Sequence, residues 1–130
     1  MATDDAVQPK RGRQLALQVT HFLRKKIRFD DAALSGEVGI LPKGAIILRG
    51  SVYVTTAFNT GTLNVGVQGG DADEFGSALA LNAAAIVAFD DLAIANAYRT
   101  EETVVTYARS ATQSAGEGFV VIEYVVDNDG

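Results

Sequence analysis

The sequence has no cysteine and no tryptophan, two prolines, and a single histidine among its 130 residues. The lack of cysteine excludes disulfides, thiolate metal sites and cysteine nucleophiles, so the fold must be stabilised by packing. His21 alone cannot form a metal site built from several histidines. Disulfide-stapled folds and the common zinc centres are therefore excluded before any motif is considered.

The chain also lacks a long apolar run. Its most apolar stretch, residues 83–89, ends at Asp90 and Asp91 and is far shorter than a bilayer span. No apolar stretch followed by a cleavage site is present near the N-terminus. The sequence therefore predicts no membrane partner and no secretory signal.

Charge is distributed unevenly along the chain. Residues 1–28 carry seven Lys/Arg and two acids, a balance of +5, whereas residues 29–130 carry four Lys/Arg and fourteen acids, a balance of −10. A basic segment on an acidic body favours an electrostatic docking element for a protein, a nucleic acid or a neighbouring copy. The alternative is a solvated tail without a specific role.

Apolar and polar residues alternate in segments that are rich in Val, Ile, Thr and Tyr, which predicts β-strands. These segments are residues 14–22, 37–41, 45–56, 63–67, 103–108 and 119–126. Roughly seven or eight short strands separated by glycine-bearing turns are typical of an all-β, jelly-roll-like antiparallel β-sandwich. We expect residues 1–13 to form a flexible basic N-terminal arm and residues 14–130 to form a single β-sandwich domain.

The first predicted strand has an apolar face that includes Leu15 and Leu17. The basic cluster of residues 24–26 is expected to interrupt this strand, and Ile27 and Phe29 are expected to share a face after it. An acidic turn then follows.

Three further segments carry local predictions. Pro42 and Gly44 predict a tight turn, and Gly50 predicts a bulge or bend within the long strand of residues 45–56. The alanine-rich stretch 77–97 is expected to be irregular, with a short strand or one helical turn. The last strand, residues 119–126, is apolar on both faces, which predicts a central rather than an edge position.

Residues 39–44 have the glycine spacing of a phosphate-binding loop. Ala45 and Ile46 stand where that motif needs lysine and serine or threonine, and a β-branched run follows where a helix should begin. We interpret Lys43 as a solvated turn residue and predict no nucleotide cofactor.

Asp71 and Asp73 begin a segment that resembles a calcium-binding loop, with glycine at its sixth position. Phe75 at the fifth position and Asn82 at the twelfth remove two ligands, including the bidentate glutamate. A solvated acidic loop is favoured over a weak cation site, and no metal is predicted.

No catalytic arrangement is visible. The acidic pairs at residues 90–91 and 101–102 are adjacent, so on a strand they point to opposite faces and make poor acid–base partners. No serine lies in a nucleophile-elbow pattern, and His21 borders a basic cluster. The sequence therefore predicts a protein that is not an enzyme and has no cofactor.

The segment "IRFDDAALSGEVGILPKGAIILRGSVYVTTAFNTGTLNVG" and the terminal "GEGFVVIEYVVDN" resemble a group of small tailed-bacteriophage virion proteins, described as head, decoration or cement proteins. The "FDDA" turn, "GILPKGAII", "VYVTTAFNTGT" and the C-terminal "IEYV" carry the likeness. The longer basic N-terminal segment is where this chain departs most from the group.

The resemblance implies a jelly-roll-like cement protein on the capsid exterior, assembled in the cytoplasm of a host bacterium. Its implied partners are the major capsid protein and further copies of itself, as a dimer or trimer at capsid symmetry axes, with no nucleic acid. From charge and the apolar face we predict that the capsid-binding residues are Lys10, Arg11, Arg13, Leu15, Leu17, Arg24, Lys25 and Lys26. The alternatives are a head-fibre base, a tail protein, or a carbohydrate- or cell-surface-binding β module with loop aromatics Phe58 and Phe75.

Overall fold

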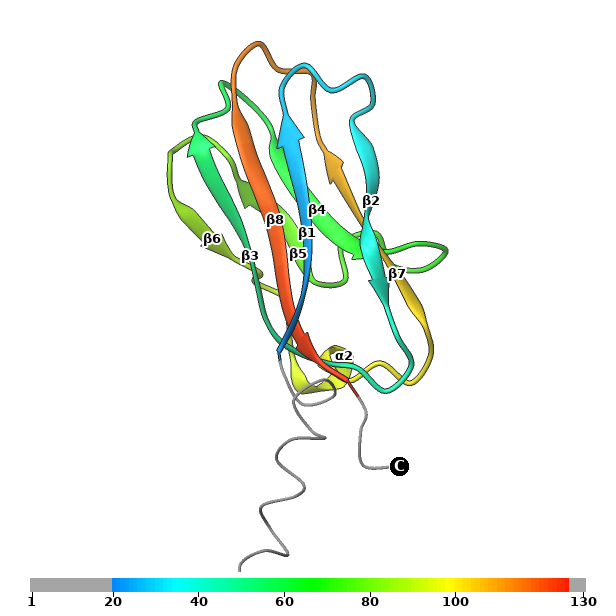
Figure 1. The fold of residues 1–130 in the computed structure, drawn as a ribbon. Helices are drawn as coiled ribbons and strands as arrows, with labels where there is room; N and C mark the ends of the chain where they lie inside the picture. The colour runs from blue at the N-terminus through cyan, green and yellow to red at the C-terminus, as the bar shows by residue number, and fades with distance from the viewer. Residues whose placement is uncertain (1–19, 127–130) are drawn as a thin grey trace, which may run out of the picture.

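The structure, a computed structural model, describes residues 20–126. Within this range the chain forms two four-stranded sheets packed face to face, with one short helix at an end of the sandwich (Figure 1). In chain order the elements are β1 (His21–Arg28), β2 (Ser35–Leu41), β3 (Ile46–Thr56), β4 (Thr62–Val67), β5 (Gly76–Ala80), β6 (Ile86–Ala88), α2 (Ile94–Ala97), β7 (Thr103–Arg109) and β8 (Glu117–Val125).

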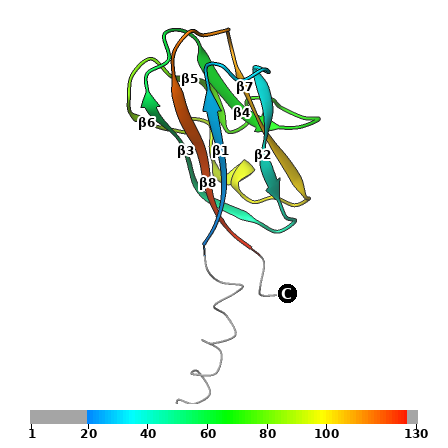
Figure 2. The ribbon, with the colours of Figure 1, turned by 45° about the horizontal axis from the view of Figure 1, so that its top comes forward.

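The strands are arranged in the order of a jelly roll. One sheet has the order β1-β8-β3-β6 and the other β2-β7-β4-β5, and all neighbours are antiparallel. β8 lies between β1 and β3 in both views (Figure 1 and Figure 2). The predicted all-β, jelly-roll-like sandwich and the central position of the last strand are both confirmed.

The core lies between the two sheets and is built from alternate residues of their strands. β8 contributes Val120 and Ile122, which are fully buried, and β7 contributes Val105. Leu63 and Val65 of β4 are also fully buried. Period-two burial on both sheets is what a sandwich requires, since each strand places every second side chain in the core.

The basic cluster does not interrupt the first strand, so that prediction is wrong. β1 runs unbroken through Arg24, Lys25 and Lys26 and pairs with β8 along its whole length. The pleat explains this: Arg24 and Lys26 point outward to solvent, while Leu23 and Ile27 point toward the other sheet. Two of the three basic residues therefore occupy solvent-facing positions of the strand, and Lys25, on its other side, is half-buried.

The ends of β1 also differ from the prediction. The predicted arm of residues 1–13 lies outside the described residues, as do residues 14–19 of the predicted first strand, and β1 begins at His21. Phe29 does not share a strand face with Ile27, because β1 ends at Arg28. The backbone N–H of Arg28 donates to the carboxylate of Asp31 (2.9 Å), which closes the predicted acidic turn.

The turn before β3 forms as predicted. Gly44 has φ +88°, a left-handed conformation that glycine adopts freely, and the N–H of Ala45 donates to the carbonyl of Pro42 (3.1 Å). A strand rather than a helix follows. Ala45 is fully buried and Ile46 begins β3.

Gly50 does not mark the bulge of β3. The irregularities lie at residues 47–49 and 54–56, on either side of it, and Gly50 itself pairs with β8. Glycine is required here because the ring of Phe89 lies against its backbone: an added Cβ would be 2.2 Å from that ring. Gly50 was therefore correctly predicted to be a special position in the strand. The reason is the close approach of the Phe89 ring, which follows β6, and not a bulge.

The alanine-rich stretch is more regular than predicted, with two short strands, β5 and β6, and the single helical turn α2. Asn96 fixes this turn. Its side-chain oxygen accepts from the N–H of Ala93 (2.8 Å), and its side-chain nitrogen donates to the carbonyls of Asp91 (2.9 Å) and Glu74 (3.0 Å). The residue preferences of this stretch did not indicate where β5 and β6 lie, because these strands are stabilised by pairing with β4 and β3.

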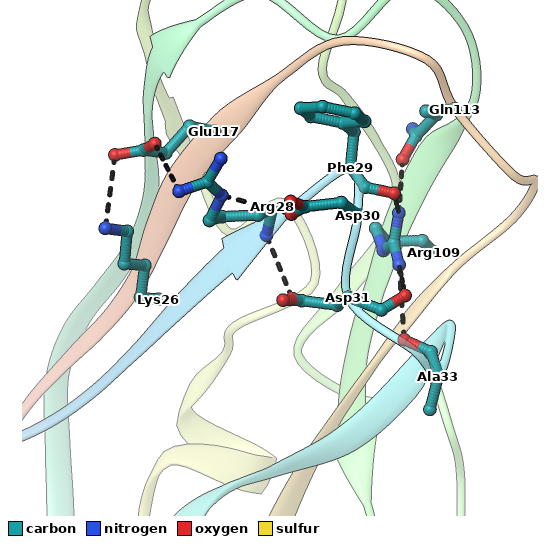
Figure 3. A network of polar contacts seen from close by, with 9 residues as sticks. All are labelled: Lys26, Arg28, Phe29, Asp30, Asp31, Ala33, Arg109, Gln113 and Glu117. Carbon is teal, nitrogen blue, oxygen red and sulfur yellow. Dashed lines mark hydrogen bonds and ion pairs between the residues drawn. The ribbon is translucent and has the colours of Figure 1, made fainter.

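Arg109 organises the loops at the opposite end of the sandwich from α2 (Figure 3). Its side chain is 3% exposed. The guanidinium donates to the side-chain oxygen of Gln113 (2.8 Å) and to the backbone carbonyls of Ala33 (3.2 Å), Phe29 (3.4 Å) and Asp31 (3.4 Å). Among the described residues its acceptors are thus all uncharged.

The network extends beyond the arginine. Gln113 donates from its side-chain nitrogen to the carbonyl of Thr60, so residues of the loops 29–34, 57–61 and 110–116 are tied together. Burial raises the pKa of the neighbouring Tyr107, and the carboxylate of Asp31 raises it further against the opposing effect of Arg109. This end of the sandwich is therefore held by polar contacts across three chain connections.

Arg109→Leu should lower the free energy of unfolding by about 3 kcal/mol, because it leaves several partly buried carbonyls and the side-chain oxygen of Gln113 without their donor. Arg49→Leu serves as the control, since its side chain is 74% exposed and a surface ion pair contributes at most about 1 kcal/mol. Urea denaturation of the two variants checks this. Equal stability of the two variants would contradict the role assigned to Arg109.

Candidate interaction surface

The sheet β1-β8-β3-β6 has one face in the core and one face in solvent, and we call the second the outer face. Its residues point away from the other sheet on each of the four strands. They are Phe22, Arg24, Lys26 and Arg28 from β1, Glu117, Phe119, Val121, Glu123 and Val125 from β8, Ile46, Arg49, Ser51 and Tyr53 from β3, and Ile86 and Ala88 from β6.

Strand register aligns these side chains in rows across the sheet. Lys26 lies opposite Phe119, which lies opposite Tyr53, which lies opposite Ile86. Directly opposite residues on one face are close enough for their side chains to interact. A band of aromatic and aliphatic side chains with a cation at its β1 end therefore crosses the whole sheet.

The outer face is unusually apolar for a surface in water. Ile86 is 65% exposed, Phe22 59% and Tyr53 41%, and Leu48 at the first irregularity of β3 is 49% exposed. On the outer side of the other sheet most positions of the two central strands are small or polar, such as Thr106, and the apolar residues there include Ile40, 49% exposed, opposite Val104. Contiguous exposed apolar surface of this kind marks an interaction site more often than scattered single residues do.

Charged side chains border this apolar band, and most are paired. Lys26 and Arg28 both contact the carboxylate of Glu117, at 3.5 and 3.8 Å, and Arg49 pairs with Glu123 at 2.6 Å. Figure 3 shows the first two pairs beside the Arg28–Asp30 contact. The face carries four cations and two acids, in contrast to the acidic body as a whole.

An open groove of about 350 Å³ lies on the outer face. It is lined by Arg24, Tyr53, Thr55, Phe119 and Val121, from β1, β3 and β8. The guanidinium carbon of Arg24 lies 4.5 Å from the centre of the Phe119 ring, a cation–π contact. The groove can accept an apolar side chain and offers a positive charge at its rim.

A larger groove of about 500 Å³ lies on the other sheet, between β2, β7 and the turn after β4. Its walls are mostly glycine, serine and alanine, with Glu37 as a charged group. Its one aromatic residue, Tyr107, is only 5% exposed, and its lining contains no cation. We therefore regard the smaller groove as the better candidate for binding a partner.

The predicted docking residues are divided by the structure. Arg24 and Lys26 lie on the outer face, whereas Lys25 lies on the opposite side of β1 with its side chain half-buried. Lys10, Arg11, Arg13, Leu15 and Leu17 lie outside the described residues. The apolar half of the surface was not predicted, although the alternate residues Phe119, Val121 and Val125 were visible in a strand that was predicted to be central because it is apolar on both faces.

The calcium-like loop uses its acids within the protein. The Asp71 carboxylate accepts from the N–H of Asp73 (3.2 Å), Asp73 accepts from the Ser77 hydroxyl (3.2 Å), and Glu74 pairs with Arg99 (2.8 Å). Over residues 20–126 no group of three or more His, Asp or Glu side chains is placed to hold a metal ion. Nor does this range contain a helix long and apolar enough to cross a membrane.

The two loop aromatics that favoured a carbohydrate-binding module are not available to a ligand. Phe58 is 1% exposed and Phe75 0% exposed. Phe58 packs against Gly116, and Phe75 lies beneath the guanidinium of Arg99. Both are core residues, so this support for a sugar-binding platform is lost.

No protein-family model matches the chain, and a search of curated proteins found no match. Solved structures do share its fold. A chain of the cyanophage Pam1 capsid asymmetric unit matches with a TM-score of 0.62 and 20% identity over 85% of this chain and 86% of that one.

Two further capsid structures contain similar chains. One is the acid-stable capsid of Helicobacter pylori bacteriophage KHP30, with a TM-score of 0.56 and 17% identity over 86% of this chain and 91% of that one. The other is the capsid of Ralstonia phage GP4, with a TM-score of 0.56 and 16% identity over 86% of each chain. At these identities the likeness establishes a common fold.

Ile86→Ser should leave the free energy of unfolding within about 0.5 kcal/mol of wild type, because Ile86 is 65% exposed and supports no core contact. Val52→Ala, on the adjacent strand but facing inward at 0% exposure, should cost about 2 kcal/mol. Thermal and urea unfolding distinguish the two. A large loss for Ile86→Ser would mean that the outer face serves the fold and not a partner.

Proposed function

We propose that this protein is a structural component of a bacteriophage virion, which binds the outside of the capsid and stabilises it by bridging major capsid subunits. The observation that carries the proposal is the outer face: an apolar and cationic surface on one sheet of a fold that occurs in three phage capsids. Such a role needs a stable body and a binding surface, and it needs no catalytic centre.

The outer face has the composition expected for a protein partner. Burying a large apolar side chain contributes roughly 1.5–3 kcal/mol, from which the cost of association must be subtracted. Phe22, Tyr53 and Ile86 together can meet that cost only if they are buried at the same time. A broad, preformed protein surface such as an assembled capsid buries them together, and its fixed geometry keeps the entropy loss small.

We further propose that the basic N-terminal segment assists attachment. It leads directly into β1, which is an edge strand of the sheet that carries the outer face. Lys10, Arg11 and Arg13 would meet carboxylates, while Leu15 and Leu17 would add apolar contact. Because exposed ion pairs are individually weak, about 0–1 kcal/mol, several must act together. Nucleic acid is a poor target, since the acidic body is repelled by phosphate.

Self-association is part of the proposal. Copies bound to an icosahedral shell are related by its symmetry axes, so a dimer or trimer would place several outer faces on neighbouring capsid subunits at once. Simultaneous engagement raises the overall affinity without new contacts. A head-fibre base or tail protein remains the second candidate function, since the same sandwich and surface would serve at a vertex.

Copy number distinguishes these two candidates. A protein that covers the shell should be present in hundreds of copies in each purified virion, in proportion to the major capsid protein, as quantified by gel densitometry or mass spectrometry. Removal of the protein should lower the temperature at which the capsid opens. A handful of copies in each particle would instead support the fibre or tail function.

Deletion of residues 2–13 should leave the sandwich folded but lower its occupancy on capsids, because it removes three of the cations of the N-terminal segment. Binding of the full-length chain should weaken as salt is raised, since exposed charge pairs are screened. The matched variant replaces Lys10, Arg11 and Arg13 with glutamine and keeps the length. If both variants decorate capsids as the wild type does, the segment has no attachment role.

A further inference from the structure

Arg24 occupies a special position among the cations of the outer face. Its guanidinium lies over the ring of Phe119, at 4.5 Å from the ring centre, on a strand that is regular on both sides of it. The contact with the aromatic face holds the long side chain in one place without using its N–H groups. Those donors remain along the edge of the guanidinium plane.

The three other cations of this face have carboxylate partners of their own. Lys26 and Arg28 share Glu117, and Arg49 pairs with Glu123. Within residues 20–126 Arg24 forms no ion pair. The register explains this, because its row across the sheet contains Val121, Ser51 and Ala88 and no acid.

The groove beside Arg24 provides an apolar floor. Phe119 and Val121 form this floor, and Tyr53 and Thr55 stand on the side opposite Arg24. At about 350 Å³ the groove is large enough to hold several water molecules, which an apolar side chain would displace favourably. A guanidinium that has no ion pair within residues 20–126 and an apolar floor thus lie side by side.

We propose that this groove receives two neighbouring side chains of a capsid subunit, one carboxylate and one apolar. The carboxylate accepts a pair of hydrogen bonds from Arg24, and the apolar side chain covers Phe119 and Val121. This inference rests on the proposed function and adds the chemistry of the partner: an acidic–apolar segment on the capsid exterior.

The two contacts support each other physically. Arg24 is already stacked, so little side-chain entropy is lost when it binds a carboxylate, and the planar fork matches both carboxylate oxygens. The apolar side chain excludes water from that pair and so strengthens it. A lysine in place of Arg24 would keep the charge but lose both the flat stacking and the bidentate geometry.

Binding to capsids assembled without this protein tests the proposal. Arg24→Gln should weaken binding about tenfold or more, and Arg24→Lys should recover only part of the loss. Lys43→Gln is the matched control: it removes one exposed cation, and Lys43 lies in the turn before β3 and outside the outer face, so binding should stay within about twofold. All variants should melt close to wild type, since Arg24 is exposed.

Three results would overturn the inference. Arg24→Gln could bind as wild type does, or Lys43→Gln could lose as much affinity as Arg24→Gln. The third concerns a carboxylate from this chain: if the double variant Asp127→Asn/Asp129→Asn reproduces the loss seen with Arg24→Gln, the partner of Arg24 is the C-terminal segment and not the capsid.

A second measurement keeps the groove testable if the wild-type protein does not bind capsids at all. The probes are acetyl-Glu-Leu-amide and its neutral match acetyl-Gln-Leu-amide, titrated at millimolar concentration into the ¹⁵N-labelled protein. The first should shift the amide signals of Phe119 and Val121 in a saturable way that Arg24→Gln abolishes. Equal shifts from both peptides would refute the recognition of a carboxylate, whereas failure on capsids with success here would refute only the proposed function.

Discussion

The placement of β8 between β1 and β3 is the constraint on which both the fold and its surface depend. β8 hydrogen-bonds to both neighbours along nearly its whole length, so each takes its register from it. Its inward residues, Val120 and Ile122, are fully buried in the core. Its outward residues, Phe119 and Val121, line the groove on the outer face. The inward face of β8 therefore forms part of the core of the sandwich, and its outward face forms part of the interaction surface.

This arrangement explains why so apolar a surface can exist without disturbing the fold. Successive side chains of a strand point to opposite faces, so the core residues and the outer-face residues are completely separated. A shift of the strand register by one residue would exchange the two sets. Paired charges such as Arg49–Glu123 lie at the margins of the apolar band and keep it bordered by hydrated groups. The apolar residues of the outer face are thus accessible to a partner, while the core residues stay buried.

Much of the fold could be predicted from the sequence because strands carry a local signal. Alternation in residues 63–67 and 103–108 and the Pro42–Gly44 turn were sufficient to place β4, β7 and the start of β3. What could not be predicted depends on distant partners. The hydrogen bonds of Arg109 reach residues about 80 positions away, and Gly50 is explained only by Phe89. Of the site, Arg24 and Lys26 could be identified by charge, but their apolar neighbours become one surface only through strand order.

The polar network around Arg109 has a consequence for the behaviour of the protein in concentrated salt. Its guanidinium is buried and its acceptors are carbonyls and an amide oxygen, so dissolved ions have little access to these contacts. The contacts around Glu117 and Glu123, in contrast, are ion pairs of partly exposed side chains, which salt screens. Salt therefore acts on the charged border of the outer face and leaves the guanidinium contacts of the loop end intact, so that a change of ionic strength alters adhesion without unfolding the body.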